Sequence, residues 1–308
     1  MNNFSVCGVD IGNITSIFSG DIQNNSELII ESRLERYSII NELGDNEIFE
    51  IDGEKWIVNQ GSFKNEHLKF KKDNFLNLLF YGIAKTCIHN KIKLVLGIPA
   101  GQYNEYHKEL KQFIKENNFK KVILGTGAIK RTKQIYIEDV IIRPESYGIK
   151  NLRTINKCID GIKTLIVDIG GGTTDIAIFD EKMRFVGGET LDIGLLELYN
   201  DIRKHISIKY CKISLEDTKK LADGQLKMIN IKDYSFIKEY QDIFMERVLN
   251  EFKGSFPNAI SCNLILAGGG GDIGFDYFNR IYTQTIKVSD ICVNAKAFYM
   301  MGVKKWQQ

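Results

Sequence analysis

The stretch that decides the fold lies in the middle of the chain and reads Asp168-Ile169-Gly170-Gly171-Gly172-Thr173-Thr174-Asp175. The segment 164–168, which ends on the first residue of this stretch, has an apolar middle and predicts a buried strand. The glycines that follow predict a turn. Consecutive glycines expose backbone N–H groups to an anion without any Cβ in the way, and the threonines add hydroxyl donors. A carboxylate such as Asp168 at the strand end can hold a hydrated Mg²⁺. The stretch therefore predicts a phosphate-binding turn, with an ordinary glycine-rich hairpin as the alternative.

A second stretch of the same kind lies near the N-terminus and reads Asp10-Ile11-Gly12-Asn13-Ile14-Thr15. It also follows an apolar segment, residues 4–10, and it precedes another predicted strand. Two such turns half a chain apart indicate a long-period repeat of two units. We therefore expect a duplicated α/β domain in which Asp10 and Asp168 face each other across a cleft and flank one metal ion.

The segments between the turns have the pattern of alternating strands and helices. In the first half we expect strands or hairpins at 16–18, 28–31, 49–51, 55–58 and 93–98, and helices at 74–89 and from Tyr103 onward. In the second half we expect strands at 164–168, 175–179 and 184–187. The arrangement predicts the α/β class.

A third glycine cluster follows the apolar residues 264–267 and consists of Gly268, Gly269, Gly270 and Gly271. Residues 269–274 formally satisfy Gly-x-Gly-x-x-Gly, so a dinucleotide-binding Rossmann unit is one interpretation. That interpretation leaves Asp10 and Asp168 unexplained. A glycine-rich surface that lets the backbone approach a purine and its ribose accounts for all three clusters together.

A carboxylate stands between the two halves in the sequence Arg143-Pro144-Glu145-Ser146, after the strand-like residues 140–142. Glu145 could orient a water molecule toward a γ-phosphate. The alternative is a helix-capping or surface glutamate.

Composition excludes several classes of protein. The 308 residues carry 41 basic and 39 acidic side chains, a net charge of +2 that gives no nucleic-acid footprint. The apolar run at 75–84 is shorter than the roughly 20 residues of a membrane span. Six cysteines without a Cys-x-x-Cys pair argue against a zinc site or a disulfide framework and indicate reduced thiols in the cytoplasm. No P-loop pattern occurs, and the basic run 69–72 is expected to be a solvated surface.

The order of these motifs resembles the actin, sugar-kinase and heat-shock-chaperone ATPase superfamily, in which they are phosphate 1, connect 1, phosphate 2 and the adenosine motif. Residues 294–302 look like its second connecting helix, and the chain is most similar to the bacterial plasmid-segregation actins, the ParM group. The resemblance implies an actin-like fold of two duplicated ribonuclease-H-like domains that flank a nucleotide cleft. They would span residues 1–150 and 151–290, with 291–308 packing back on the first.

The resemblance also implies function. It suggests that the chain binds ATP, or GTP, together with Mg²⁺ and hydrolyses the nucleotide. Glu145 and Asp168 would be the catalytic residues, and Asp10 and Asp168 would lie at the metal. It suggests a helix near Glu216, Asp217 and Lys220 at the ribose. The nucleotide-binding residues would be Asp10, Gly12, Asn13, Thr15, Gly170, Gly171, Gly172, Thr173, Thr174, Lys220, Gly268, Gly269, Gly270 and Gly271.

The relatives in the ParM group imply a cytoplasmic filament that segregates plasmid DNA through a DNA-binding adaptor. The expected partners are then other copies of this chain and the adaptor, with no direct nucleic-acid contact and no membrane. A small-molecule kinase of the same superfamily and a non-polymerising ATP-binding regulator are the alternatives, because a superfamily does not fix a function.

One position departs from the family pattern. The superfamily usually has a lysine seven residues after the phosphate 1 aspartate, and Ile17 stands there in this chain. Either another cation meets the phosphates or nucleotide is held less tightly.

Overall fold

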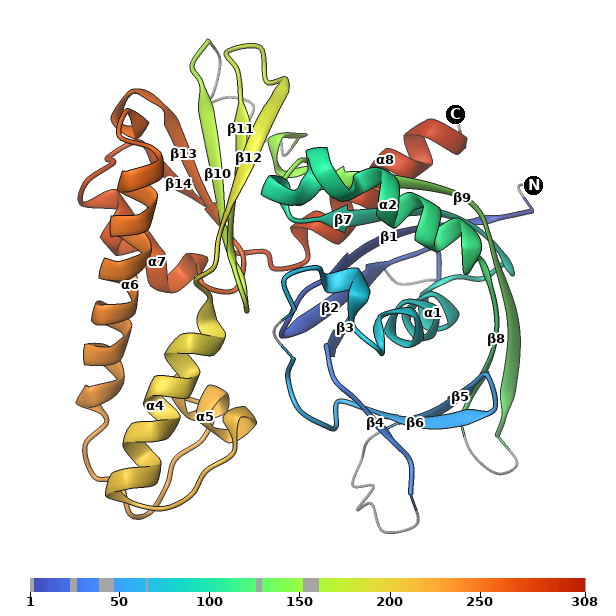
Figure 1. Ribbon diagram of the computed structural model, residues 1–308, viewed down its shortest axis with the longest axis horizontal. Coiled ribbons are helices and arrows are strands. Elements are labelled where there is room, and N and C mark those ends of the chain that lie inside the picture. The colour runs from blue at the N-terminus through green and yellow to red at the C-terminus, as the bar shows by residue number, and fades with distance from the viewer. Residues whose placement is uncertain are drawn as a thin grey trace.

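The computed structural model describes residues 3–22, 27–38, 47–64, 66–125, 129–151 and 161–307. Figure 1 shows two α/β lobes side by side, the first built mainly from the N-terminal half and the second from the C-terminal half. The last helix, α8 (Val293–Trp306), returns to the first lobe. The limits expected near residues 150 and 290 stay a prediction.

The second lobe contains a five-stranded sheet in the order β12-β11-β10-β13-β14. The central strand β10 (Thr164–Ile169) is antiparallel to β11 (Thr174–Phe179) and parallel to β13 (Asn263–Ala267). The outer strands are β12 (Phe185–Leu191) and β14 (Thr285–Lys287). The helices of this lobe are α4 (Leu195–Lys209), α5 (Leu215–Ala222), α6 (Ser235–Ser255) and α7 (Gly271–Asn279).

The first lobe repeats this topology in the strand order β3-β2-β1-β7-β9. Strand β1 (Ser5–Ile11) is antiparallel to β2 (Thr15–Ser19) and parallel to β7 (Lys91–Ile98). The outer strands are β3 (Leu28–Glu31) and β9 (Arg131–Pro144), and β9 is parallel to β7. The duplicated α/β architecture predicted from the two aspartate turns is confirmed.

The first sheet then continues beyond the repeated unit. Strand β9 also pairs with β8 (Phe119–Leu124), and the order runs on through β5 (Ile48–Ile51), β6 (Glu54–Val58) and β4 (Leu34–Arg36). The resulting nine-stranded sheet curls around α1 (Phe75–Thr86) (Figure 1). Its end strands β3 and β4 are separated only by Ser32 and Arg33, so both ends of the sheet meet at this corner, which we call the seam.

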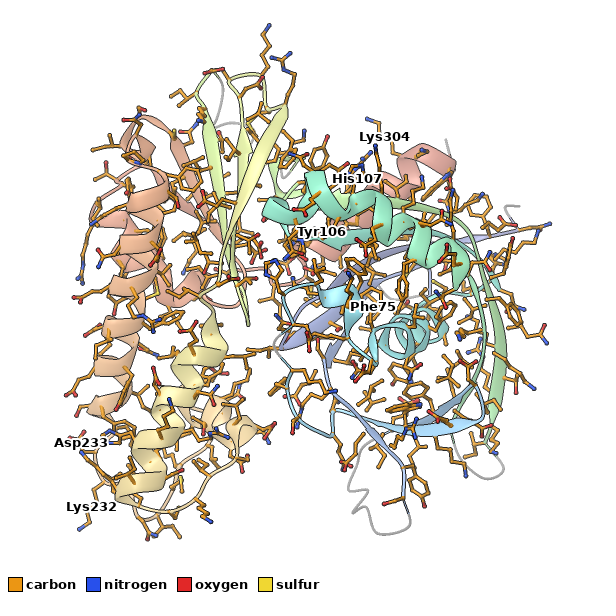
Figure 2. The ribbon with its side chains drawn as sticks, in the orientation of Figure 1. Phe75, Tyr106, His107, Lys232, Asp233 and Lys304 are labelled. Atoms are coloured by element: carbon orange, nitrogen blue, oxygen red, sulfur yellow. The ribbon has the colours of Figure 1, made fainter. Side chains whose placement is uncertain are left out.

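Helices cover both faces of the first sheet. Phe75 at the start of α1 lies inside the curl (Figure 2), where it is 2% exposed, and α2 (Tyr103–Glu116) contributes to the same core. On the other face α8 packs so closely that a Cβ on Gly8 would lie 2.3 Å from the carbonyl oxygen of Ala295. Strands buried on both faces explain the apolar runs seen in the sequence. No helix in the described parts of the chain is long and apolar enough to cross a membrane.

The lobes touch directly where the 3₁₀ turn η2 (Ala100–Gln102) lies against β12. A Cβ on Gly188 of β12 would lie 2.6 Å from the carbonyl carbon of Ala100, and a Cβ on Gly101 would lie 2.7 Å from the Thr190 nitrogen. Only glycine lets the two backbones approach this closely. We call this η2–β12 contact, where the two lobes pack directly against each other, the hinge contact.

The expectation that residues 69–72 form a solvated surface is wrong. Phe70 is 4% exposed and lies 6.1 Å, between ring centroids, from Phe113 of α2, and Lys69 and Lys72 are largely buried with it, whereas Lys71 stays exposed. Lys69 belongs to the 3₁₀ turn η1 (Lys69–Lys71), and its side chain is only 11% exposed. Lys72 is 5% exposed, and its Nζ has no hydrogen-bond partner within the part of the chain that the structure describes. Burial lowers the pKa of Lys72 from 10.5 to about 7.

Replacing Lys72 with methionine should stabilise the protein at low pH. A buried ammonium without a partner is unfavourable, and between pH 7 and 10.5 the unfolded chain binds more protons than the folded one. The free energy of unfolding of the parent therefore rises with pH through this range. We expect Lys72→Met to be more stable than the parent at about pH 6 and to lose this advantage toward about pH 10. Urea unfolding at several pH values measures the free energy of unfolding of both proteins, with Lys71→Met, at an exposed lysine, as the control. A gain in stability that does not change with pH would contradict this explanation.

Candidate functional site

A cleft of about 280 Å³ lies between the lobes, at the carboxyl ends of the central strands β1 and β10. Ligands of α/β proteins bind at this end of a sheet. Of the site residues predicted from the sequence, the cleft wall contains Asp10, Gly12, Asn13, Thr15, Glu145, Asp168, Gly170, Gly171, Gly172, Thr173, Gly268 and Gly269. The structure thus brings together most of a set that is scattered along the sequence.

The two aspartate turns have the same backbone geometry. The Gly12 nitrogen donates to the Thr15 carbonyl, and the Gly170 nitrogen donates to the Thr173 carbonyl, both at 2.9 Å. A Cβ on Gly12 or Gly170 would lie 2.7 or 3.0 Å from the same carbonyl oxygen, which explains glycine at both positions. The turns also touch across the cleft, since a Cβ on Gly171 would lie 2.5 Å from the Ile14 side chain.

One amide joins the two aspartates. The Asn294 Nδ2 at the start of α8 donates to Asp10 Oδ2 and to Asp168 Oδ2, each at 3.1 Å, and its Oδ1 accepts from the Ser146 nitrogen at 2.9 Å. Burial, together with the charges of Asp10 and Asp175, raises the pKa of Asp168 to about 7. Two convergent carboxylates that repel each other fit a hard divalent cation such as Mg²⁺, because it prefers oxygen ligands and would relieve the repulsion.

Glu145 is buried at the edge of the same cleft. It follows β9, its backbone nitrogen donates to the Ile98 carbonyl at 2.7 Å, and it is 5% exposed. The Lys69 Nζ donates to both carboxylate oxygens, at 2.9 and 3.0 Å. Burial raises the pKa of Glu145, and the Lys69 ammonium opposes that rise. The alternative of a surface glutamate is therefore wrong.

Lys69 places a positive charge in the cleft, where the sequence supplies none at Ile17. It lines the cleft, and the charges of Glu145, Asp175 and Asp10 raise its pKa despite its burial. Ile17 lines the cleft as well, but with an apolar side chain that packs against Cys292 and Ala295. The positive charge thus comes from η1 rather than from β2, and the basic run in the sequence gave no sign of it.

Asp175, the last residue of the second turn, is a further member of the site that the sequence argument did not select. It is 3% exposed, and it accepts hydrogen bonds from the Thr173 and Thr190 hydroxyls at 2.9 and 2.6 Å. Its burial raises its pKa. The preceding Thr174 points the other way, because side chains alternate along a strand, and its hydroxyl donates to the Ile193 carbonyl outside the cleft.

The third glycine cluster divides between the cleft and a helix. Gly268 has a positive φ of 79°, and a Cβ there would lie 2.1 Å from Asp168 Oδ1. Gly269 also lines the cleft, whereas Gly270 caps α7 and Gly271 begins it, outside the cleft wall. The Rossmann interpretation fails, because β13 lies in a mixed sheet beside a strand that has its own glycine turn.

The helix expected at the ribose is at the cleft, but with a different face inward. Lys219 and Asp223 of the α5 region line the cleft together with Tyr199 of α4, and the Lys219 Nζ lies 2.9 Å from Asp223 Oδ2. Lys220 is exposed and does not line the cleft. A rotation of one residue along a helix, about 100°, separates the expected residue from the one found.

Comparison with known proteins finds a family match for the first lobe. Residues 8–148 match the family described as actin-like proteins, N-terminal domain. A search of curated proteins finds no significant match to the sequence.

Solved structures extend the likeness to the whole chain. An archaeal actin homologue, Ta0583, in complex with ADP has 17% sequence identity and a TM-score of 0.81, over 97% of this chain and 99% of its own. A ParM from a 15-stranded filament of Clostridium botulinum has 18% identity and a TM-score of 0.79, over 98% and 100%. Bacillus thuringiensis ParM with AMPPNP has 16% identity and a TM-score of 0.68, over 99% of both chains.

The two-lobed architecture is therefore the actin-like fold, as the motifs predicted. The first lobe matches the actin-like N-terminal domain, and over its whole length the chain is similar in fold to ParM and Alp12.

Replacing Gly268 with alanine should disrupt the site. The new Cβ would meet the Asp168 carboxylate at 2.1 Å, at a backbone conformation that alanine rarely adopts. We expect a loss of about 1–3 kcal/mol in the free energy of unfolding. At Gly269 a Cβ would meet only the Leu195 side chain, at 3.6 Å, so Gly269→Ala is the matched control. Equal losses in the two variants, measured by chemical denaturation, would contradict the assigned clash.

Proposed function

We propose that this chain binds ATP, or GTP, with Mg²⁺ in the cleft, hydrolyses it, and assembles into filaments while the triphosphate is bound. The observation that carries the proposal is the convergence of two identical glycine turns, from two lobes, on one buried group of charges formed by Asp10, Asp168, Glu145 and Lys69. Similar folds are known with ADP and with AMPPNP, which supports a nucleotide as the ligand.

The glycine turns would bind the phosphates through backbone N–H groups. The cleft places one turn on each side, so a triphosphate would contact both lobes. Asp10 and Asp168 would hold the metal, which supplies charge neutralisation at the phosphates. Lys69 would add a positive charge to the same phosphates, the role left open by Ile17.

Hydrolysis would depend on Glu145. Its carboxylate is held in place by the Lys69 ammonium, and burial raises its pKa toward the range of a general base. It would orient the attacking water and accept a proton from it. Lys69 would keep the carboxylate in position for the next turnover.

Assembly would follow from the same contacts. A γ-phosphate bound by both turns would draw the lobes together about the hinge at η2 and β12. A head-to-tail contact between unlike faces gives an open helical filament unless the rotation closes into a ring. Similarity in fold to ParM and Alp12 from filament structures supports this part of the proposal.

The cellular role we propose is segregation of plasmid DNA in the cytoplasm, through an adaptor that binds the DNA. The fold similarity to ParM supports this role. A net charge of +2 gives the chain little attraction for DNA, which favours an adaptor over direct contact.

Sedimentation tests the proposal directly. We expect the chain to pellet with ATP and Mg²⁺ above a sharp critical concentration, and to stay in the supernatant with ADP or without nucleotide. Gly171→Leu should abolish pelleting, because its side chain would collide with Ile14 and hold the turns apart. If the parent binds and hydrolyses nucleotide but stays monomeric under every condition, the filament proposal fails and a small-molecule kinase becomes the better candidate.

Glu145→Gln should separate hydrolysis from binding. The amide keeps the size of the side chain but cannot act as a base, so hydrolysis should slow by about 10²–10⁴-fold while nucleotide still binds. Filaments should then persist longer after assembly. Phosphate release and light scattering measure the two effects, and Glu109→Gln, at an exposed glutamate paired with Lys71, serves as control. Phosphate release at the parental rate would show that Glu145 is not the base.

A further inference from the structure

We propose that Arg33 and Glu216 form a latch across the mouth of the cleft and set the rates at which nucleotide binds and leaves. The Arg33 Nη1 of the first lobe lies 3.1 Å from Glu216 Oε1 of α5 in the second lobe. The side chains are only 13% and 22% exposed, so solvent screens the pair less than it screens a surface ion pair. The inference rests on the proposed function for the identity of the ligand.

Arg33 is held rigidly on its own lobe. It lies at the seam of the nine-stranded sheet, its Nη1 also donates to the Gly61 carbonyl at 2.9 Å, and its Nε donates to Glu31 Oε2 at 2.8 Å. Gly61 has a positive φ of 89°, a conformation that suits glycine. A guanidinium already held in this way loses little side-chain entropy when it pairs with Glu216.

An apolar contact accompanies the ion pair. The ring of Phe63 lies under the Arg33 guanidinium, with 4.9 Å between the ring centroid and Cζ. The same ring packs against the hydrophobic cluster that joins the core of the second lobe to Ile14 of the first. Phe63 comes from the first lobe, in the segment that follows β6. The latch therefore has a charged part and an apolar part, and both connect the lobes.

The latch and the cleft share one helix. Glu216 lies in the first turn of α5, and Lys219, which lines the cleft, is three residues later on the same helix face. Figure 1 shows α5 on the side of the second lobe that is turned toward the first. Neither Arg33 nor Glu216 lines the cleft itself. The pair thus controls the position of a cleft helix without belonging to the binding surface.

This placement predicts a distinct kinetic effect. A residue that contacts the ligand changes mainly the dissociation rate and so changes the affinity. A latch that joins one lobe to the other at the mouth of the cleft must open both when nucleotide enters and when it leaves. Its removal should therefore raise the association and dissociation rates together and leave the dissociation constant nearly unchanged.

Stopped-flow fluorescence with N-methylanthraniloyl-ADP and Mg²⁺ tests the inference on the full chain. We expect Glu216→Gln to raise both rates by about two- to tenfold, the effect of losing a partly exposed ion pair, with the dissociation constant changed less than about twofold. Glu216→Lys should raise them further, because it places a like charge opposite Arg33. Phe63→Ala should also raise both rates, because it removes the apolar part of the latch. Added salt should speed exchange in the parent more than in Glu216→Gln.

The matched control is Glu54→Gln, which removes an Arg36–Glu54 pair of 2.7 Å that lies within the first lobe, between β4 and β6, and does not connect the lobes. Its rates should equal those of the parent, and thermal unfolding should confirm that every variant is folded. If the parent binds the probe but both Glu216→Gln and Phe63→Ala exchange it at the parental rates, the latch is overturned. A faster dissociation alone, with weaker affinity, would make Glu216 a ligand contact and also overturns it. If the parent binds no probe at any concentration, the proposed function itself fails.

Discussion

The hydrogen bonds of Asn294 are the interaction on which the rest of the site depends. Its side-chain amide binds Asp10 of the first lobe and Asp168 of the second, and its oxygen fixes the backbone beside Glu145. Asn294 can reach all three because α8 crosses back to β1, where Gly8 leaves room for it. A single residue near the C-terminus thereby sets the relative position of the two turns and of the buried glutamate.

The charges that this arrangement brings together are unfavourable for the folded protein on its own. Asp10, Asp168, Asp175 and Glu145 lie close to the ammonium of Lys69, and burial raises the pKa of the Asp168, Asp175 and Glu145 carboxyls. Natural proteins retain such clusters mainly at functional sites, where a ligand supplies the missing charge. A bound cation would relieve the repulsion among these carboxylates.

Much of the fold and of the candidate site could be predicted from the sequence. The parts that could not be predicted have a physical cause in common. The aspartate turns and the strands were predictable because glycine patterns and apolar runs are local signals. Lys69 was not, because it lies beside Phe70, which packs against Phe113 of α2, and such a contact between distant segments leaves no periodic trace. Lys219 was missed in favour of Lys220 because sequence spacing does not fix the rotation of a helix. The extension of the first sheet through β8, β5, β6 and β4 depends on strand pairing, which hairpin signals do not specify.

The hinge contact at β12 has a consequence for solubility. Edge strands present unpaired backbone groups and invite association with other chains. In the first lobe the end strands β3 and β4 are short and meet at the seam, so little of either edge is free. In the second lobe β12 is a seven-residue edge, and η2 lies against it at Gly188. The first lobe thus covers part of the longer edge strand of the second, and a chain cut between the lobes would expose it.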